Sequence, residues 1–195
     1  MEMGAGGHTV KRGASKGAFV TATQELLRRQ GYAASGLEQI VARSGAPKGS
    51  LYFHFPGGKQ ELAIAAMERS GAQLRDAMAA ILDSSDDAEE AIGRLIDTLA
   101  AGLEASGFAD GCPIATVALE TAGTSEPMRE TARAAFDSWI EVLEQRLIRA
   151  GVDPVLAEQR ALFVLAAIEG ALILARASRG VAPLRAVASQ LRAIS

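Results

Sequence analysis

The sequence predicts an all-α protein of about nine helices. Apolar residues make up 49% of its 195 residues and alanine is abundant, whereas aromatic residues make up only 5%. This composition favours packed helices over a β-sandwich. Capping residues and Gly or Pro breakers divide the chain into segments of helical length, and no convincing strand or repeat is visible. We therefore expect one large or two small helical domains with a substantial core.

The amino-terminal part is expected to hold a Gly-rich arm over residues 1–14, followed by three helices. Gly31 fits the left-handed position after the first helix. Ser35 and Glu38 have the spacing of a capping box, which places the start of the second helix at Ser35. The three helices are expected at residues 15–30, 35–44 and 47–53.

Six further helical segments follow. Ser125 and Asp153 each precede a helix with Pro in its first turn, and Asp86 with Glu89 can cap another helix. A loop is expected over residues 107–111. The six helices are expected at residues 59–82, 87–106, 113–122, 126–150, 154–179 and 183–194.

The segment of residues 44–55 has the form of the turn and second helix of a helix-turn-helix. Gly45 supplies the positive φ that a tight interhelical turn needs. Pro47 presets the first helical turn and has no N–H to leave unpaired. Leu51 and Phe55, four residues apart, can anchor the short helix on a core while polar and cationic side chains look outward. Such a helix suits the major groove of DNA.

The charge of the chain is distributed unevenly. Residues 1–60 carry 8 basic and 3 acidic residues, a net charge of +5, and include all four lysines. The remainder carries 12 arginines and 20 acidic residues, a net charge of −8. A basic head on an acidic body suggests a polyanion partner for the head, although charge alone also allows a merely solvated surface.

Seven residues are candidates for contact with DNA. Lys48 suits a phosphate or a guanine edge, and Gly49 allows close backbone approach. The Ser50 hydroxyl and the Phe53 ring suit base edges, the ring through a thymine methyl group. The remaining side chains suit phosphates, which fix register without reading sequence. The seven candidates are Lys48, Gly49, Ser50, Tyr52, Phe53, His54 and Lys59.

Residues 15–70 carry a specific pattern of motifs in a specific order. They are Arg29-Gln30-Gly31-Tyr32, Ile40-Val41, Ser44-Gly45, the run Lys48-Gly49-Ser50-Leu51-Tyr52-Phe53-His54-Phe55, and Lys59 with Leu62. This pattern resembles the DNA-binding domain of the TetR family of transcriptional repressors. Three further motifs resemble the branch of that family that contains lincomycin-resistance repressors. They are Pro56-Gly57-Gly58-Lys59, Gly111-Cys112-Pro113 and Ala118-Leu119-Glu120.

The resemblance implies a DNA-binding domain over residues 1–58 and a ligand-binding and dimerisation domain over residues 59–195. It implies a homodimer that binds double-stranded DNA at a palindromic operator and represses transcription. It also implies that a small lipophilic effector releases the repressor from the operator. The sequence departs from the usual family pattern at Pro47, where Ser or Thr is common. It also has three residues rather than two between Phe55 and Lys59.

An apolar effector pocket is expected among the helices of the second domain. For each candidate, plain core packing explains the residue equally well. The candidate lining residues are Phe108, Ile114, Val117, Glu120, Phe136, Trp139, Ile140 and Phe163. Glu120 and Glu169 are acids in apolar surroundings, where a carboxyl group is either paired or functional. Glu169 is also a candidate for the dimer interface.

The segment 154–179 carries small residues that permit close helix approach. Together with the last helix it is expected to form a four-helix dimer interface, and intramolecular packing is the alternative explanation. The small residues are Ala157, Ala161, Ala166, Ala167, Gly170 and Ala171.

Other functional classes find little support in the sequence. Cys112 is the single cysteine, so an internal disulfide is excluded and a structural role is favoured over a redox or nucleophilic one. We expect no metal, no cofactor and no catalysis, because no cluster has ligand spacing and nothing nucleophilic lies near His54 in sequence. A helical enzyme and an adaptor for acidic proteins remain as rival functions. The longest apolar run, residues 161–175, is interrupted by Glu169 and is shorter than the roughly 20 residues that span a bilayer. A cytoplasmic protein is therefore expected.

Overall fold

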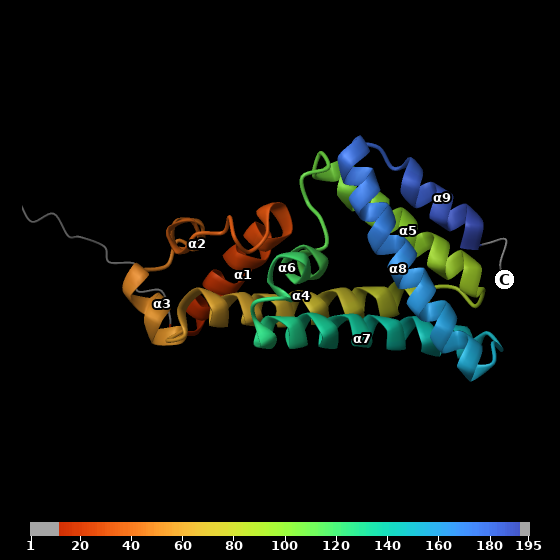
Figure 1. The fold of residues 1–195 in the computed structure, drawn as a ribbon, viewed down its shortest axis with the longest axis horizontal. Helices are drawn as coiled ribbons and strands as arrows, with labels where there is room; N and C mark the ends of the chain where they lie inside the picture. The colour runs from red at the N-terminus through yellow and green to blue at the C-terminus, as the bar shows by residue number, and fades with distance from the viewer. Residues whose placement is uncertain (1–11, 192–195) are drawn as a thin grey trace, which may run out of the picture.

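The computed structural model describes residues 12–191, which form helices joined by turns and loops and contain no strand (Figure 1). The prediction of an all-α fold is therefore confirmed. The first helix begins at Arg12 rather than at residue 15, and the second begins at Leu37 rather than at Ser35. The helices are α1 (Arg12–Gln30), α2 (Leu37–Ser44), α3 (Lys48–His54), α4 (Gly58–Leu82), α5 (Ala88–Ala105), α6 (Pro113–Thr121), α7 (Glu126–Arg149), α8 (Pro154–Ser178) and α9 (Ala182–Leu191).

Both ends of the chain extend beyond the described residues. Of the expected arm, residues 1–11 lie outside the described range and residues 12–14 belong to the first turn of α1. The expected end of the last helix, residues 192–194, also lies outside it.

The predicted capping box at Ser35 is wrong. The Ser35 hydroxyl is buried and donates a hydrogen bond back to the carbonyl of Gly31 at 2.5 Å. Gly36 is the residue that precedes the first turn of α2, and its N–H donates to Oε1 of Gln39 at 3.3 Å. The serine thus closes the preceding turn, where Gly31 has a φ of 77°.

The predicted cap of α5 is displaced by one residue. Oδ1 of Asp87, not of Asp86, accepts from the N–H groups of Glu89 and Glu90 at 2.8 and 3.0 Å. The other two predicted caps are confirmed. Ser125 accepts from Met128 N–H before α7, and Asp153 accepts from Val155 and Leu156 N–H before α8.

The body is built on the long helices α4 and α7, which lie side by side (Figure 1). The indole of Trp139 on α7 is fully buried between them and donates from Nε1 to the carbonyl of Gly71 on α4 at 2.9 Å. Gly71 permits this approach, because a Cβ there would lie 3.0 Å from Cβ of Ala135. The helices α5, α8 and α9 pack at the far end of this pair.

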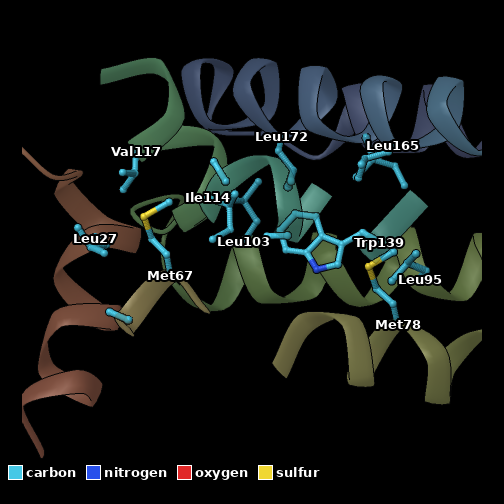
Figure 2. Packing of buried hydrophobic residues seen from close by; sticks show 14 of the residues in the cluster. Leu27, Met67, Met78, Leu95, Leu103, Ile114, Val117, Trp139, Leu165 and Leu172 are labelled. Atoms are coloured by element: carbon cyan, nitrogen blue, oxygen red, sulfur yellow. The ribbon is translucent and has the colours of Figure 1, made fainter. Parts of the chain in front are cut away.

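The amino-terminal helices share their core with the body. The helix α1 packs against α4 and α6, and Figure 2 shows Leu27 of α1 on the same side of the core as Met67 of α4 and Val117 of α6. These residues belong to one buried cluster that extends to Trp139 and Leu165. The head, which we define as α1 to α3, is therefore positioned by packing on two helices of the body.

The helix α8 is long and apolar enough to cross a membrane by length and composition alone. The core helix of a soluble protein can have the same composition. One side of α8, including Ala161, Val164, Ile168 and Ala175, is buried, and the helix packs against α7 and α9.

Candidate DNA-binding face and effector site

The turn that precedes α3 has the geometry that the sequence predicts. Gly45 ends α2 in the left-handed region, with a φ of 64°. The Ser44 hydroxyl accepts from the N–H of Ala46 at 3.1 Å, which tightens the turn. Pro47 precedes the first turn of α3 with a φ of −60°. The chain can therefore reverse direction within a few residues and present α3 at the end of the molecule (Figure 1).

The helix α3 is anchored by its back and exposed at its front. Leu51 and Phe55 are each only 1% exposed, so the predicted anchors are confirmed. Tyr52 and Phe53 are 55% and 69% exposed. Exposed aromatic rings on a short, well-anchored helix lie outside the core and can meet a flat or grooved partner.

The polar residues of α3 include Lys48 and Ser50 in its first turn and His54 at its end. Lys48 is exposed, and its Nζ lies 3.8 Å from Oε1 of the exposed Glu38, a pair of little energetic weight. Gly49 is exposed on the same turn. The Ser50 hydroxyl donates to the carbonyl of Pro47 at 2.7 Å, which leaves its oxygen able to accept from a base. His54 is half-buried, with its ring edge-on to Phe53 at 5.1 Å.

Lys59, the DNA-contact candidate that lies outside α3, is in the first turn of α4 and contacts the turn between α1 and α2. Its Nζ is 4.3 Å from the centroid of the Tyr32 ring and donates to the carbonyl of Ala33 at 3.3 Å. Oε2 of Glu120 accepts from the N–H groups of the same two residues at 2.8 and 2.7 Å. Burial lowers the pKa of Lys59, and the charge of Glu120 opposes that shift. Sequence reasoning assigned Lys59 and Glu120 to two different sites, whereas they meet at one junction.

Most of the predicted pocket residues converge on the core of the body. Ile114, Val117 and Trp139 are fully buried, and Figure 2 shows all three within the core. The Phe136 ring meets the Trp139 indole edge-on at 5.4 Å. The half-buried members of the set, which pack against the same cluster, are Phe108, Phe136 and Ile140.

Two predicted pocket residues lie away from this core. Glu120 is exposed at the end of α6, and Phe163 is 54% exposed on α8. Phe163 instead borders a cavity of about 370 Å³ where the ends of α5, α7, α8 and α9 meet. The lining of this cavity includes the apolar residues Ile92, Leu147 and Val164 and carboxylates near the start of α5.

Cys112 has a structural position at the start of α6. Its Sγ accepts from the N–H of Ala115 at 3.4 Å, and the thiol lies near the carboxyl group of Glu169 on α8. Burial raises the pKa of both the Cys112 thiol and the Glu169 carboxyl group. A thiol with a raised pKa is a poor nucleophile, because the thiolate is the reactive form.

Sequence reasoning missed an exposed apolar stripe on α8. The large apolar residues of this stripe recur at helical spacing in the sequence. Because α8 is apolar on all sides, this spacing alone does not show which side of the helix is exposed. Among the small residues expected there, Ala157, Ala161 and Ala171 are buried within the chain itself. The large residues of the stripe are Val155, Leu162, Phe163, Ile173 and Leu174.

Over residues 12–191, no group of three or more His, Cys, Asp or Glu side chains has a metal-binding arrangement. The buried guanidinium of Arg146 has a structural role instead. It donates to the carbonyls of Leu82 and Ser85 at 3.1 and 2.8 Å, where α4 ends.

The comparisons with known proteins agree with this architecture. Residues 19–66 match the family described as bacterial regulatory proteins, tetR family. Residues 88–190 match the family described as transcriptional regulator LmrA/YxaF-like, C-terminal domain. These are families of transcriptional regulators and not of enzymes.

Two relatives from Bacillus subtilis match nearly the whole chain. The HTH-type transcriptional regulator LmrA is 35% identical over 177 residues, which cover 91% of this chain and 94% of the relative. The uncharacterized HTH-type transcriptional regulator YxaF is 37% identical over 180 residues, covering 92% and 94%.

A solved structure has the same fold. The TetR transcriptional regulator from Chloroflexus aurantiacus superimposes with a TM-score of 0.79 at 28% identity, over 92% of this chain and 93% of that one. With both family matches and the two relatives spanning the head and the body, the chain belongs to the TetR family of transcriptional regulators and to its LmrA/YxaF-like branch.

Proposed function

We propose that this regulator is a repressor that binds an inverted-repeat operator as a homodimer and leaves it when a small lipophilic effector binds. The observation that carries the proposal is the outward face of α3, where Lys48, Tyr52 and Phe53 are exposed on a helix whose back is fully buried. A helix of this kind can enter the major groove without disturbing the core. The protein would act in the cytoplasm, where its operator is found.

The proposed roles of the α3 residues follow from their chemistry. Lys48 neutralises phosphate or meets a guanine edge, and the exposed Gly49 lets the backbone come close to the DNA. Ser50 and Phe53 meet base edges, the former as a hydrogen-bond acceptor. Tyr52 and His54 contact phosphates beside the groove.

The proposed dimer uses the apolar stripe of α8 together with α9. An apolar face of this kind is typical of interaction sites, and α8 and α9 pack against each other at the end of the molecule remote from α3 (Figure 1). A twofold axis there would pair the same helices of two copies in a four-helix arrangement. The two α3 helices would then meet successive major grooves about 34–36 Å apart.

The proposed effector site is the core around Trp139, bordered by the half-buried Phe108, Phe136 and Ile140, with Ile114 and Val117 buried in the same cluster. An effector that opens this core would bind one arrangement of the helices better than another and so shift the equilibrium between them. The cavity of about 370 Å³ beside Phe163 is a second candidate, because its size falls within the usual range of ligand pockets.

The first experiment is a selection of bound duplexes from a random pool, repeated with a panel of lipophilic compounds. We expect an inverted repeat to be enriched and its enrichment to disappear with one compound. Binding should also weaken steeply with salt, because phosphate neutralisation releases counterions. Enrichment of no sequence, together with binding that does not respond to salt, would contradict the proposal.

The fluorescence of Trp139 then distinguishes the two effector sites, because it is the only tryptophan of the chain. A compound bound at the core should change this emission strongly. Substitution of Phe136→Ala should weaken such binding, whereas Phe163→Ala should leave it unchanged. The opposite pattern would assign the effector to the cavity beside Phe163.

A further inference from the structure

The turn between α1 and α2 is held by a carboxylate that comes from the body. Glu120, near the end of α6, accepts from the backbone N–H groups of Tyr32 and Ala33 at 2.8 and 2.7 Å. Hydrogen bonds to an ionised acceptor are stronger than neutral ones. Gly31 makes the approach possible, because a Cβ at this position would clash with the carboxylate of Glu120.

Lys59, in the first turn of α4, completes the arrangement. Its ammonium group lies 4.3 Å from the centroid of the Tyr32 ring and donates to the Ala33 carbonyl at 3.3 Å. The same turn of the head is therefore held through its N–H groups by α6 and through its carbonyl and ring by α4. A lysine engaged in this way would give up these interactions if it turned toward a phosphate.

A second set of contacts joins the head to the segment just before α6. Nε of Arg28, near the end of α1, lies 2.8 Å from Oδ2 of Asp110, and the N–H of Gly111 donates to the Arg28 carbonyl at 3.0 Å. At the start of α6, Cys112 lies near the carboxyl group of Glu169 on α8. The segment that leads into α6 and the end of α6 therefore both contact the head, and the start of α6 also lies near Glu169 of α8.

We propose that Glu120 and Lys59 form an interdomain latch, which sets the orientation of the head relative to α6, and that Lys59 is a positioning residue rather than a phosphate ligand. This inference rests on the DNA-binding function proposed above. It also gives α6 a direct route to the head, in addition to the route through α4.

The salt dependence of DNA binding tests the role of Lys59. The probe is a mixed-sequence duplex of about 30 base pairs, long enough for two grooves on one face. Lys48→Met should reduce the slope of log K against log salt by about 0.9 for each phosphate that is no longer neutralised. Lys59→Met should leave the slope at its wild-type value. A slope reduced by Lys59→Met as much as by Lys48→Met would overturn the proposal.

The direction of the affinity change provides a second criterion. Removal of either half of the latch should shift the dissociation constant in the same direction, and the double variant should add little to the single variants. If Lys59 bound phosphate instead, Lys59→Met would weaken binding, whereas Glu120→Ala would strengthen it by removing a nearby negative charge. Opposite shifts would therefore reject the latch.

Amide hydrogen exchange tests the latch without DNA. The N–H groups of Tyr32 and Ala33 should exchange faster in Glu120→Ala, and Glu120→Gln should restore part of the protection, because its amide oxygen still accepts hydrogen bonds. The control is Glu141→Ala, which removes an exposed glutamate from α7. Unchanged exchange in Glu120→Ala would overturn the latch, whereas wild-type protein that ignores duplex DNA would instead overturn the proposed function.

Discussion

At the scale of the residue, the α3 face divides into groups that fix position and groups that read sequence. Lys48→Ala should weaken binding to operator and random DNA alike, because a phosphate contact carries no sequence information. Phe53→Ala should change sequence preference more than affinity for random DNA, because base-edge contacts specify the site. Gel-shift titrations with both duplexes measure the two effects. Equal weakening on both duplexes for Phe53→Ala would contradict its base-reading role.

Arg146 illustrates a buried charge that stabilises the fold. Its guanidinium is buried and donates to two carbonyls where α4 ends. Arg146→Met should lower the free energy of unfolding by about 2–3 kcal/mol, because hydrogen bonds to charged groups are strong and the carbonyls would be left without these donors. Arg133→Met, which removes an exposed partner of Asp137, should cost less than about 1 kcal/mol. Urea unfolding measures the free energy of unfolding of both variants. Similar losses in Arg146→Met and Arg133→Met would contradict this role of Arg146.

Glu169 should make stability depend on pH in a defined direction. Burial raises the pKa of its carboxyl group above the ordinary value, so the folded state favours the protonated form. Its stabilising contribution is therefore complete below the unfolded pKa and is lost as pH rises through the folded pKa. Glu169→Gln should become relatively more stable than wild type as pH rises through this window. Urea unfolding at a series of pH values measures the difference in the free energy of unfolding between the two proteins. A difference that does not change with pH would contradict the raised pKa of Glu169.

At the scale of the element, the apolar stripe of α8 predicts how two copies assemble. Phe163→Glu or Ile173→Glu should weaken the dimer by about 100-fold or more, because like charges facing each other across an interface cost several kcal/mol. Leu119→Glu is the matched control, since Leu119 is an exposed leucine on α6. Sedimentation velocity over a range of concentrations measures the dissociation constant. A dimer that tolerates both α8 variants would place the interface elsewhere.

The helices themselves could be predicted well because their boundaries depend on local chemistry. Ser125-Glu126-Pro127 predicted the start of α7, and Asp153-Pro154 predicted the start of α8. Both could be recognised because a capping side chain and its N–H partners lie within four residues of each other. The errors at Ser35 and Asp86 also have local causes. The Ser35 hydroxyl bonds the carbonyl of Gly31 in the preceding turn, and of the two adjacent aspartates it is Asp87 that accepts from the first N–H groups of α5.

At the scale of the whole molecule, the head and the body share one continuous core, and α6 is attached to both. The polar interactions of the latch therefore lie where a movement of α6 would change the orientation of the head. A coupling of this kind requires two arrangements of the helices that the effector and DNA prefer differently. Interactions that could differ between two such arrangements lie at the Tyr32 turn and at the Cys112–Glu169 pair.

The sequence by itself determined the helical class, most helix boundaries, and the inward and outward faces of α3, because these depend on residues within one or two turns of each other. Only the tertiary structure decided that Lys59 and Glu120 meet, that Phe163 lies away from Trp139, and that large residues of α8 face solvent. These outcomes depend on the relative rotation of helices far apart in the chain, which neither spacing nor composition encodes.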